Sequence, residues 1–304
     1  MRTTASDAGS SETPPETTGE TAREIADGTP AETPAGSRAR GRTTRRLSAG
    51  LRRAAPPAGV LLAGLVLWQG FVTVTHQRPD LFPGPFEVGR RILAMSRSGL
   101  LWQAVGTSVG RGVLGFLVSV VLATLLGLLL AWSPWLRAGL GPLLSGLQVL
   151  PSVAWVPAAI VWFGLTDATV YTVILLGAVP SVAMGLVAGI DGVDPQHRRV
   201  AAVLGAGPLT VLTRVLWPAA LPVYLGGLRQ GWAFSWRALM AAEIIAVGGS
   251  LGIGLGGLLD RGRQNADMAT VFAAILAILV IGVLVELLVF APLHRAVLRR
   301  RGLS

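Results

Sequence analysis

Uncharged apolar stretches, each about long enough to cross a membrane, recur along the chain after residue 53. A helix needs about 20 mostly apolar residues to cross the hydrocarbon core of a bilayer. The runs without Arg, Asp or Glu that meet or nearly meet this length are Ala54–Gln77, Gly112–Leu136, Ala138–Thr166, Ala168–Ile190 and Met268–Val285. These runs predict a polytopic membrane protein rather than a soluble enzyme.

A sixth span is interrupted by charged residues. Apolar character continues from Leu221 to Val247 through Arg229, Arg237 and Glu243. We predict one helix here, with its ionisable side chains facing protein or water rather than lipid. The predicted fold class is therefore an all-α polytopic membrane protein with about six transmembrane helices. The predicted spans are about 57–76, 107–132, 138–164, 168–190, 221–247 and 268–291.

The first 53 residues differ in character from the rest. Residues 1–37 are rich in Ser, Thr, Pro, Glu and Ala and have almost no large apolar side chains. Such a segment cannot bury enough surface to offset the entropy of ordering it. Seven Arg follow between Arg38 and Arg53. We predict a disordered tail over 1–53, acidic and then Arg-rich, and a transmembrane domain over 54–304.

The composition excludes several classes of protein. Charged residues make up 14% of the chain, against about a quarter in a soluble domain. There is no Cys, and all 26 basic residues are Arg, so neither a thiol site nor the lysine of a Walker A ATP site can exist. The net charge of +10 comes from Arg clusters that flank apolar runs. That placement is typical of membrane topology signals, and we expect no nucleic-acid partner.

The same Arg clusters predict the orientation. The cluster before the first span places the N-terminus in the cytoplasm, and six crossings return the Arg-rich end at 295–301 to that side. The loop 191–220 then also lies inside, while 78–103 lies outside as a loosely amphipathic, interfacial helix. An alternative is that Arg45 and Arg46 belong to a twin-arginine signal, whose cleavage would leave five spans.

Two sets of residues suggest chemistry of their own. Gly252-x-Gly254-x-x-Gly257 has the spacing of a dinucleotide-binding turn, but that motif functions between a strand and a helix. We expect an external turn or close helix packing instead. Arg229, Arg237 and Glu243 could line a polar path or hydrogen-bond between helices, and both interpretations stay open. No His-Glu-x-x-His pair is present, and no enzymatic activity is expected.

The internal loop after the fourth predicted span carries the most specific pattern. Residues 193–206 read VDPQHRRVAAVLGA, and Pro218, preceded by Trp217, lies thirteen residues after Gly205. This loop resembles the cytoplasmic signature of ABC importer permeases, in which Glu-Ala-Ala is followed by three residues, Gly, and a more distant Leu-Pro. Arg199 stands at the position of the signature Glu, and Trp217 stands at the position of its Leu.

Other segments resemble one branch of this family, the nitrate, taurine and aliphatic-sulfonate permeases. They are 81–85 (LFPGP), 151–157 (PSVAWVP), 162–164 (WFG), 227–229 (GLR), 242–243 (AE) and 251–254 (LGIG). The resemblance covers about Leu81 to Arg301, and the order and spacing of the segments carry it.

The resemblance implies a permease subunit in a bacterial inner membrane. It implies that the loop forms coupling helices that dock on a separate ATP-binding cassette ATPase, which alone binds and hydrolyses ATP, so this chain needs no cofactor. It also implies an extracellular or periplasmic solute-binding protein and a second permease copy, in a homodimer or heterodimer. The loop residues that the resemblance singles out are Arg198, Arg199, Ala201, Ala202, Gly205, Ala206 and Pro218.

The solute is expected to be a small anion, such as an aliphatic sulfonate, taurine or nitrate, drawn to Arg237, with Arg229 and Glu243 as further path residues. An importer of another small solute, such as a vitamin precursor, would have similar spans. A secondary transporter would show inverted repeats and midplane carboxylates, of which only Glu243 and Glu286 are candidates. A membrane scaffold would need no coupling loop.

Overall fold

The computed structural model describes residues 59–60, 62–74, 81–249 and 251–299, and the predicted tail over 1–53 lies outside them. Contacts group residues 61–304 into one compact unit, to which the following description applies. Its regular elements within the described ranges are helices, which confirms the predicted all-α class. They are the helix Leu62–Val74, α2 (Pro85–Arg97), α3 (Leu100–Trp132), α4 (Pro134–Val149), η1 (Ser152–Trp155), α5 (Val156–Phe163), α6 (Asp167–Asp191), α7 (Pro195–Val203), α8 (Pro208–Val211), η2 (Leu212–Leu216), α9 (Trp217–Ile245), α10 (Leu255–Gln264), α11 (Met268–Val285), η3 (Glu286–Phe290) and α12 (Ala291–Arg299).

Four continuous helices in the described ranges are long and apolar enough to cross a membrane. They are Leu100–Trp132, Asp167–Asp191, Pro208–Ile245 and Met268–Arg299, and they contain most of the second, fourth, fifth and sixth predicted spans. The shorter apolar helix Leu62–Val74 falls within the first predicted span. The chain is thus a polytopic helical membrane protein, as its apolar runs predict.

The third predicted span, 138–164, is not one continuous helix. α4 and the η1–α5 segment are bent by 102° with respect to each other. Pro151 lies at the break, and a residue that precedes proline is disfavoured in the helical conformation. Leu150 is accordingly extended, with φ −69° and ψ 126°. Proline carries no charge, so counting charged residues could not reveal this break within the predicted span.

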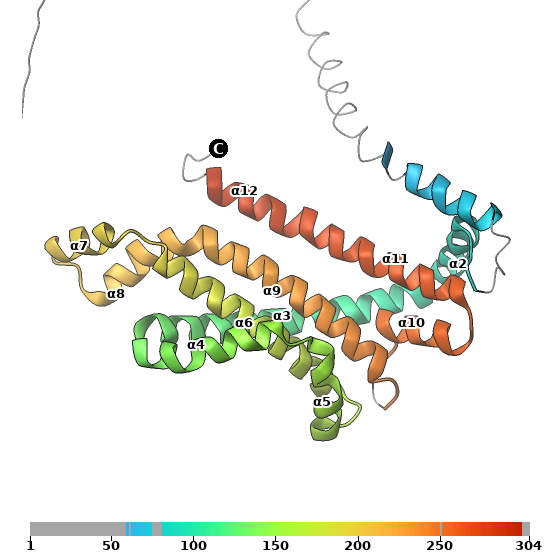
Figure 1. Cartoon of the computed structure of the whole chain (residues 1–304), viewed down its shortest axis with the longest axis horizontal. Helices are drawn as coiled ribbons and strands as arrows, with labels where there is room; N and C mark the ends of the chain where they lie inside the picture. Colours follow the sequence, from blue (N-terminus) through green and yellow to red (C-terminus); the bar gives the residue numbers. More distant parts are fainter. Residues whose placement is uncertain (1–58, 61, 75–80, 250, 300–304) are drawn as a thin grey trace, which may run out of the picture. The chain divides into compact units, whose positions relative to one another are not determined.

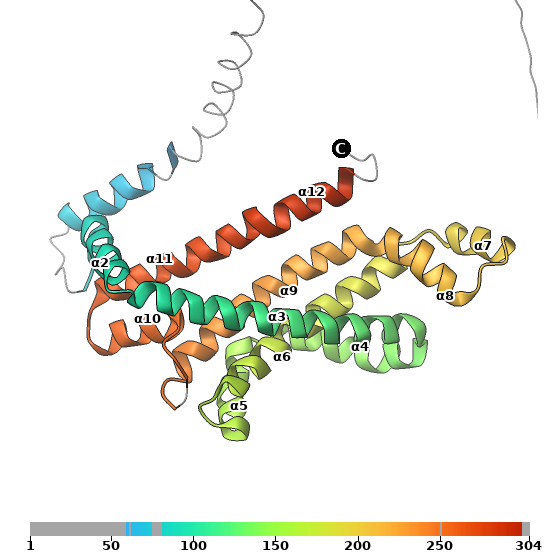
Figure 2. The same ribbon diagram turned by 180° about the vertical axis from the view of Figure 1, so that it is seen from behind.

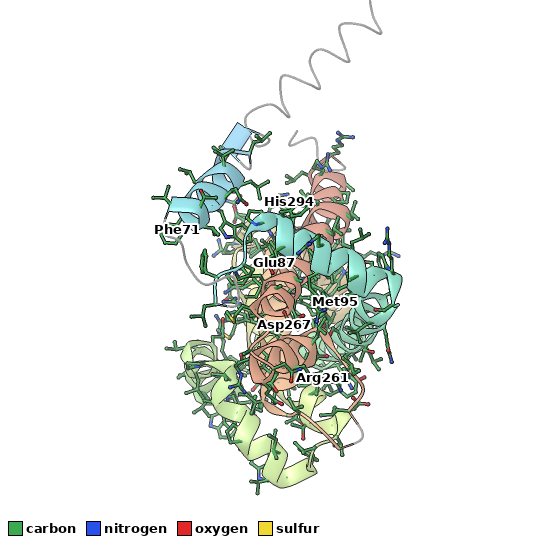
Figure 3. The ribbon with its side chains drawn as sticks, turned by 90° about the vertical axis from the view of Figure 1, so that its right-hand side faces the viewer. Phe71, Glu87, Met95, Arg261, Asp267 and His294 are labelled. Atoms are coloured by element: carbon green, nitrogen blue, oxygen red, sulfur yellow. The ribbon has the colours of Figure 1, made fainter. Side chains whose placement is uncertain are left out.

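The segment before α3 also differs from the predicted boundaries. Gly99 adopts φ +79° between α2 and α3, and α3 begins at Leu100 rather than near residue 107. The amphipathic helix expected within 78–103 is α2, which buries Val88 and Met95. Arg91 of α2 binds Asp267, directly before α11, at 2.5 Å. Figure 3 faces the end of the unit that carries α2 and the start of α11, with Asp267 labelled.

α6 is the buried centre of the unit and packs against α9 and α3. Its contact with α9 depends on glycine. A Cβ on Gly185 would lie 2.6 Å from the Cα of Gly227, and a Cβ on Gly189 would lie 2.9 Å from the carbonyl oxygen of Ala220. Small residues let helix backbones approach closely, which favours helix association inside a membrane.

The face of α3 that packs into the unit is also made mainly of small residues, whereas the opposite face carries large apolar side chains. The small buried positions recur every three or four residues, as expected for one side of a helix. They are Ala104, Ser108, Gly112, Gly115, Ser119, Ala123 and Gly127. Leu114, Leu117 and Val121 point outward and are exposed, as suits a lipid-facing surface.

Helix ends gather on two opposite sides, as Figures 1 and 2 show from front and back. One side holds α7, α8, the C-terminal end of α6 and the start of α9. The other side holds α2, α10 and the start of α11. On the α7 side, Arg137 of α4 donates to Asp191 at the end of α6, with Nη1 2.8 Å from Oδ1. This ion pair ties the α3–α4 turn to the base of the α7–α8 segment.

Candidate functional site

The loop predicted to couple to an ATPase contains two short helices, α7 and α8. α7 begins after Asp194, whose carboxylate accepts a hydrogen bond from the Gln196 amide at 2.8 Å. Pro195 follows Asp194 in the first turn, where a missing backbone donor costs nothing. Arg198 reaches back to the carbonyl oxygen of Ile190, at 3.4 Å, near the C-terminal end of α6. The base of the loop is therefore held by its own side chains.

Gly205 follows the end of α7 in a left-handed turn. Gly205 has φ +74°, a conformation that side chains with a Cβ rarely adopt. The Ala206 amide donates to the Ala201 carbonyl at 2.9 Å and the Gly205 amide to the Ala202 carbonyl at 3.0 Å. These two bonds are those of a Schellman helix end. The glycine that aligns the loop with the permease signature thus has a defined structural role.

The surface of this loop is more apolar than its small residues suggest. Ala201 is buried, whereas Val203, Leu204 and Leu209 are 88%, 80% and 72% exposed. Arg199, at the position of the signature Glu, is also exposed, and Pro218 lies in the first turn of α9. Clustered exposed apolar side chains of this kind mark a surface that another protein or the membrane covers.

A second candidate region is a stripe on α9, defined here as Gly226, Arg229, Gln230, Ala233 and Arg237. Except for the adjacent Arg229 and Gln230, successive members are three or four positions apart, so the residues share one side of the helix. They are exposed in the isolated chain and line a hollow of about 550 Å³ together with residues of α11 and η3. An Arg at the centre of a membrane helix costs about 2.5–3.5 kcal/mol when it faces lipid, so this stripe must face protein or water.

The two cations of the stripe have different partners. Arg229 forms an ion pair with Glu286, the first residue of η3, at 2.7 Å. Arg237 lies over the ring of Phe234, 4.7 Å from its centroid. Its Nε donates to the Ala233 carbonyl at 3.0 Å, and no ion pair is found for it among the described residues. Arg237 also lines a second hollow of about 180 Å³ together with residues of the α4–α5 break.

Glu243, predicted as a path residue, lies in a buried cluster instead of on the stripe. It is 4% exposed. It accepts hydrogen bonds from Arg111 Nη1 at 3.1 Å and from the Ser108 hydroxyl at 2.7 Å, both on α3. Arg111 also binds Asp167 at the start of α6, at 2.7 Å. The cluster therefore connects α3, α6 and α9 beside a cavity of about 250 Å³.

The same cluster holds the start of α10 and explains the Gly252-x-Gly254 motif. The first amide groups of a helix lack partners within it. Ser108 accepts from the Leu255 amide at 2.8 Å, and Glu243 accepts from the Gly256 amide at 3.0 Å. A Cβ on Gly254 would lie 2.3 Å from the Glu243 carboxylate oxygens. Gly254 and Gly256 therefore pack closely against Glu243, whereas Gly252, through which the helix-packing spacings were expected to run, has open space around it.

Sequence reasoning missed Arg111 and Ser108 as members of this cluster. The apolar run was counted from Gly112, so Arg111 was treated as a charge at its edge. One signal was available: an Arg so close to an apolar run of α3 needs an acidic partner, and Glu243 is an acid within a membrane helix. The spacing of residues 111 and 243 along the chain could not show that they meet. Among the described residues, no group of three or more His, Cys, Asp or Glu could hold a metal ion.

The fold and these features define a polytopic membrane component with an exposed helical loop at one end and an exposed polar stripe on a central helix. Family comparison identifies the class. The profile described as binding-protein-dependent transport system inner membrane component matches residues 123–294, and the chain belongs to this family. It is therefore the inner-membrane permease component of an ABC system, and ATP is bound and hydrolysed by a separate ATPase subunit.

Several relatives match most of the chain. The taurine transport system permease protein TauC of Escherichia coli (strain K12) is 31% identical over 75% of this chain and 84% of its own length. The putative aliphatic sulfonates transport permease protein SsuC of Bacillus subtilis (strain 168) is 31% identical over 79% and 87%. The bicarbonate transport system permease protein CmpB of Synechococcus elongatus (strain ATCC 33912 / PCC 7942 / FACHB-805) is 32% identical over 80% and 89%. The resemblance that the loop and span motifs indicate is confirmed.

Proposed function

We propose that this permease forms the translocation path for a small anionic solute, such as an aliphatic sulfonate, taurine or nitrate. The observation that carries the proposal is Arg237, a cation in the C-terminal third of α9 that has no carboxylate partner among the described residues. A guanidinium presents several donors in a plane and matches oxyanions well. The names of the relatives, which specify taurine, sulfonates and bicarbonate, point to the same class of solute.

The α9 stripe is the proposed wall of the path. In a single chain it would bring Arg229 and Arg237 against lipid, at a cost that a facing protein surface or water removes. A second permease copy, placed with its own stripe across the path, would supply that surface. Glu243 then serves the path indirectly, because it holds the end of α9 against α3 and α10.

The α7–α8 loop is the proposed contact with the ATPase. Its exposed apolar residues, Val203, Leu204 and Leu209, would enter a groove on that subunit, and Arg198, Arg199 and Arg214 would face acidic groups there. Closure of the ATPase pair would then move α9, which follows the loop directly through η2. The solute-binding protein would deliver solute at the opposite side.

The orientation follows from this assignment. We place the α7–α8 loop, the N-terminal tail over 1–53 and the C-terminus in the cytoplasm, in line with the Arg clusters that flank the spans. α2 and α10 then face the outside.

The proposal is tested by uptake in cells that express the whole importer. Wild type is assayed with taurine, methanesulfonate, nitrate and bicarbonate, and Arg237→Gln is compared at equal membrane abundance. We expect Arg237→Gln to lower uptake tenfold or more and Arg237→Lys to retain part of it, because a point charge replaces a planar donor group. Arg97→Gln, which removes an exposed Arg of α2, is the matched control. Unchanged uptake by Arg237→Gln, or uptake of none of the four anions by wild type, would contradict the proposal.

A further inference from the structure

The contact between Arg229 and Glu286 has the geometry of a guanidinium bound to an oxyanion. Arg229 Nε lies 2.9 Å from Glu286 Oε2, and Nη2 lies 2.7 Å from Oε1. Both carboxylate oxygens are thus bound by two parallel donors, the same fork that recognises carboxylate or other planar and tetrahedral oxyanions. Both residues lie near the middle of long membrane helices.

The pair lies where two hollows meet. One hollow, of about 550 Å³, extends past Trp232 and Trp236 to Arg237. The other, of about 310 Å³, extends past Phe290 to His294 and Arg295 on α12. Gly226, Arg229 and Glu286 are the residues that line both. A solute that passes from one hollow to the other along α9 must therefore pass this pair.

The larger hollow contains more donors than acceptors. Besides the two Arg of the stripe, it is lined by Trp236, whose side chain is buried and whose indole N–H has no hydrogen-bond partner in the described part of the chain. Glu286 is its acidic lining residue, and the Arg229 fork occupies both of its carboxylate oxygens. This arrangement fits an anionic occupant.

Glu286 also stands at a place where its helix departs from regular geometry. The five residues Glu286–Phe290 form a π-helical turn between α11 and α12. Such turns carry a locally widened hydrogen-bond pattern and occur often at functional sites. The side chain of Glu286 is 35% exposed and that of Arg229 is 64% exposed. The pair is therefore accessible from the hollows rather than locked in the packed interior.

We propose that Glu286 is a built-in substitute for the anionic group of the solute. In the empty permease it occupies the fork of Arg229, and an incoming oxyanion displaces it. The resident carboxylate lowers the cost of a cation at the membrane centre. It also sets a threshold for entry: a solute must offer two oxygens to the fork, so a monatomic ion such as chloride does not displace Glu286. This inference rests on the proposed transport of an anion and assigns the residue that gates it.

The test uses the purified, full-length permease and follows thermal stabilisation by methanesulfonate, taurine, nitrate and bicarbonate, with ionic strength kept constant by chloride. Glu286→Gln removes the resident anion while preserving the shape of the side chain. We expect it to tighten the apparent affinity for at least one oxyanion by fivefold or more. We expect the double variant Arg229→Gln with Glu286→Gln to lose that gain, and Arg229→Gln alone to show no gain. Glu87→Gln, the same change on α2, is the control and should alter nothing.

The outcomes separate a gate from a structural ion pair. If the ion pair is purely structural, Glu286→Gln lowers the melting temperature without tightening the binding of any of the four anions. That result would overturn the inference. The inference would also be overturned if chloride stabilised Glu286→Gln as strongly as the oxyanions do. If Arg237→Gln leaves uptake unchanged but Glu286→Gln tightens anion binding, the role given to Arg237 fails while the gate stands. If Arg237→Gln lowers uptake but Glu286→Gln does not tighten anion binding, the gate fails while the role of Arg237 stands.

Discussion

At the scale of single residues, the described structure shows that charged groups within the helices fall into two kinds. Arg111 and Glu243 are nearly fully buried, and each satisfies the other together with Ser108. Arg229 and Arg237 are exposed on one side of α9. Removing one partner of a buried ion pair leaves an uncompensated charge and costs about 3–5 kcal/mol. The first kind therefore maintains the fold, and the second kind is the one that we propose for contact with a solute.

Gly254 provides a residue-scale prediction. A Cβ at this position would collide with the Glu243 carboxylate, whereas a Cβ on Gly252 would meet nothing within 4 Å. We expect Gly254→Ala to destabilise the protein by about 1–3 kcal/mol, as is usual for overpacking, and to lower the melting temperature by several degrees. Gly252→Ala is the matched control and should melt like wild type. The packing role of the motif would be refuted by equal melting temperatures of the two variants in detergent.

At the scale of elements, the helices are held by close backbone contact and by polar ties at their ends. α6 and α9 touch through Gly185 and Gly227. α2 and α11 are connected by Arg91 and Asp267. Apolar attraction between helices is weak within lipid, so association depends on such fits and hydrogen bonds. Periodicity in the sequence predicts that helices form, and these contacts decide how they are arranged.

The glycine contact predicts a strong positional effect on α9. A Cβ on Gly227 would lie 2.8 Å from the Cα of Gly185, while the adjacent Gly226 has open space around it. We expect Gly227→Ala to separate α6 from α9 and to lower the free energy of unfolding by about 1–3 kcal/mol. Gly226→Ala should be close to neutral, and even stabilising through helix propensity. Thermal unfolding of both variants in detergent provides the measurement, and a stable Gly227→Ala would show that the contact is not limiting.

Asp267 predicts a pH dependence of the tie between α2 and α11. Burial alone would raise the pKa of Asp267, but hydrogen bonds from the Thr270 hydroxyl and amide, together with the charge of Arg91, outweigh it and hold the pKa below its ordinary value. A carboxylate with a lowered pKa in the folded state stabilises it at pH values above the unfolded pKa, about 3.9. That stabilisation is lost as the pH falls through the folded pKa.

The corresponding variant is Asp267→Asn, which keeps a capping oxygen but not the charge. We expect it to lower stability by about 1 kcal/mol at pH 7, in the range of partly exposed pairs, and the difference from wild type to disappear below pH 4. Melting temperatures measured from pH 7 to pH 3 test this expectation, with Glu87→Gln as a control for general acid effects. A difference that stayed constant with pH would exclude the charge as its cause.

At the scale of the whole molecule, the α7–α8 loop and the α9 stripe are connected by one continuous helical segment. The helix Pro208–Ile245 runs from α8 through η2 and along the full length of α9. A displacement at α8 can therefore reach Arg229 and Arg237 along unbroken helical backbone, which includes the π-helical turn η2. This continuity gives the proposed coupling a physical route within a single chain.

Leu204 tests that coupling. The side chain is 80% exposed at the end of α7, so Leu204→Asp should leave the fold intact while placing a charge in the proposed ATPase groove. We expect co-purification of the ATPase subunit to fall at least tenfold and ATP-driven uptake to fall with it. Leu81→Asp, a comparable change at an exposed leucine outside this loop, is the control. If the ATPase remained bound to Leu204→Asp as it does to wild type, the docking surface would have to lie elsewhere.

The sequence by itself determined the class of this protein. Long apolar runs require membrane helices, because backbone groups in lipid must be paired within the segment. The order and spacing of short motifs from Leu81 onward identified the family, and Gly205 was recognised because its place in the signature depends only on local spacing. The lack of Lys excluded a Walker A site. All of these conclusions depend on residues that lie near one another in the chain.

Only the tertiary structure decided which distant residues meet. Arg111 and Glu243 are separated by 132 positions, and nothing in either segment specifies the other as its partner. The separation of Glu243 from the stripe of Arg229 and Arg237 likewise depends on packing between helices. In a membrane, lipid is as apolar as the helix faces, so apolarity alone does not favour one helix pairing over another. Shape complementarity and hydrogen bonds between helices select one arrangement. These contacts exist only between helices that are packed together, so they cannot be derived from one segment of the sequence.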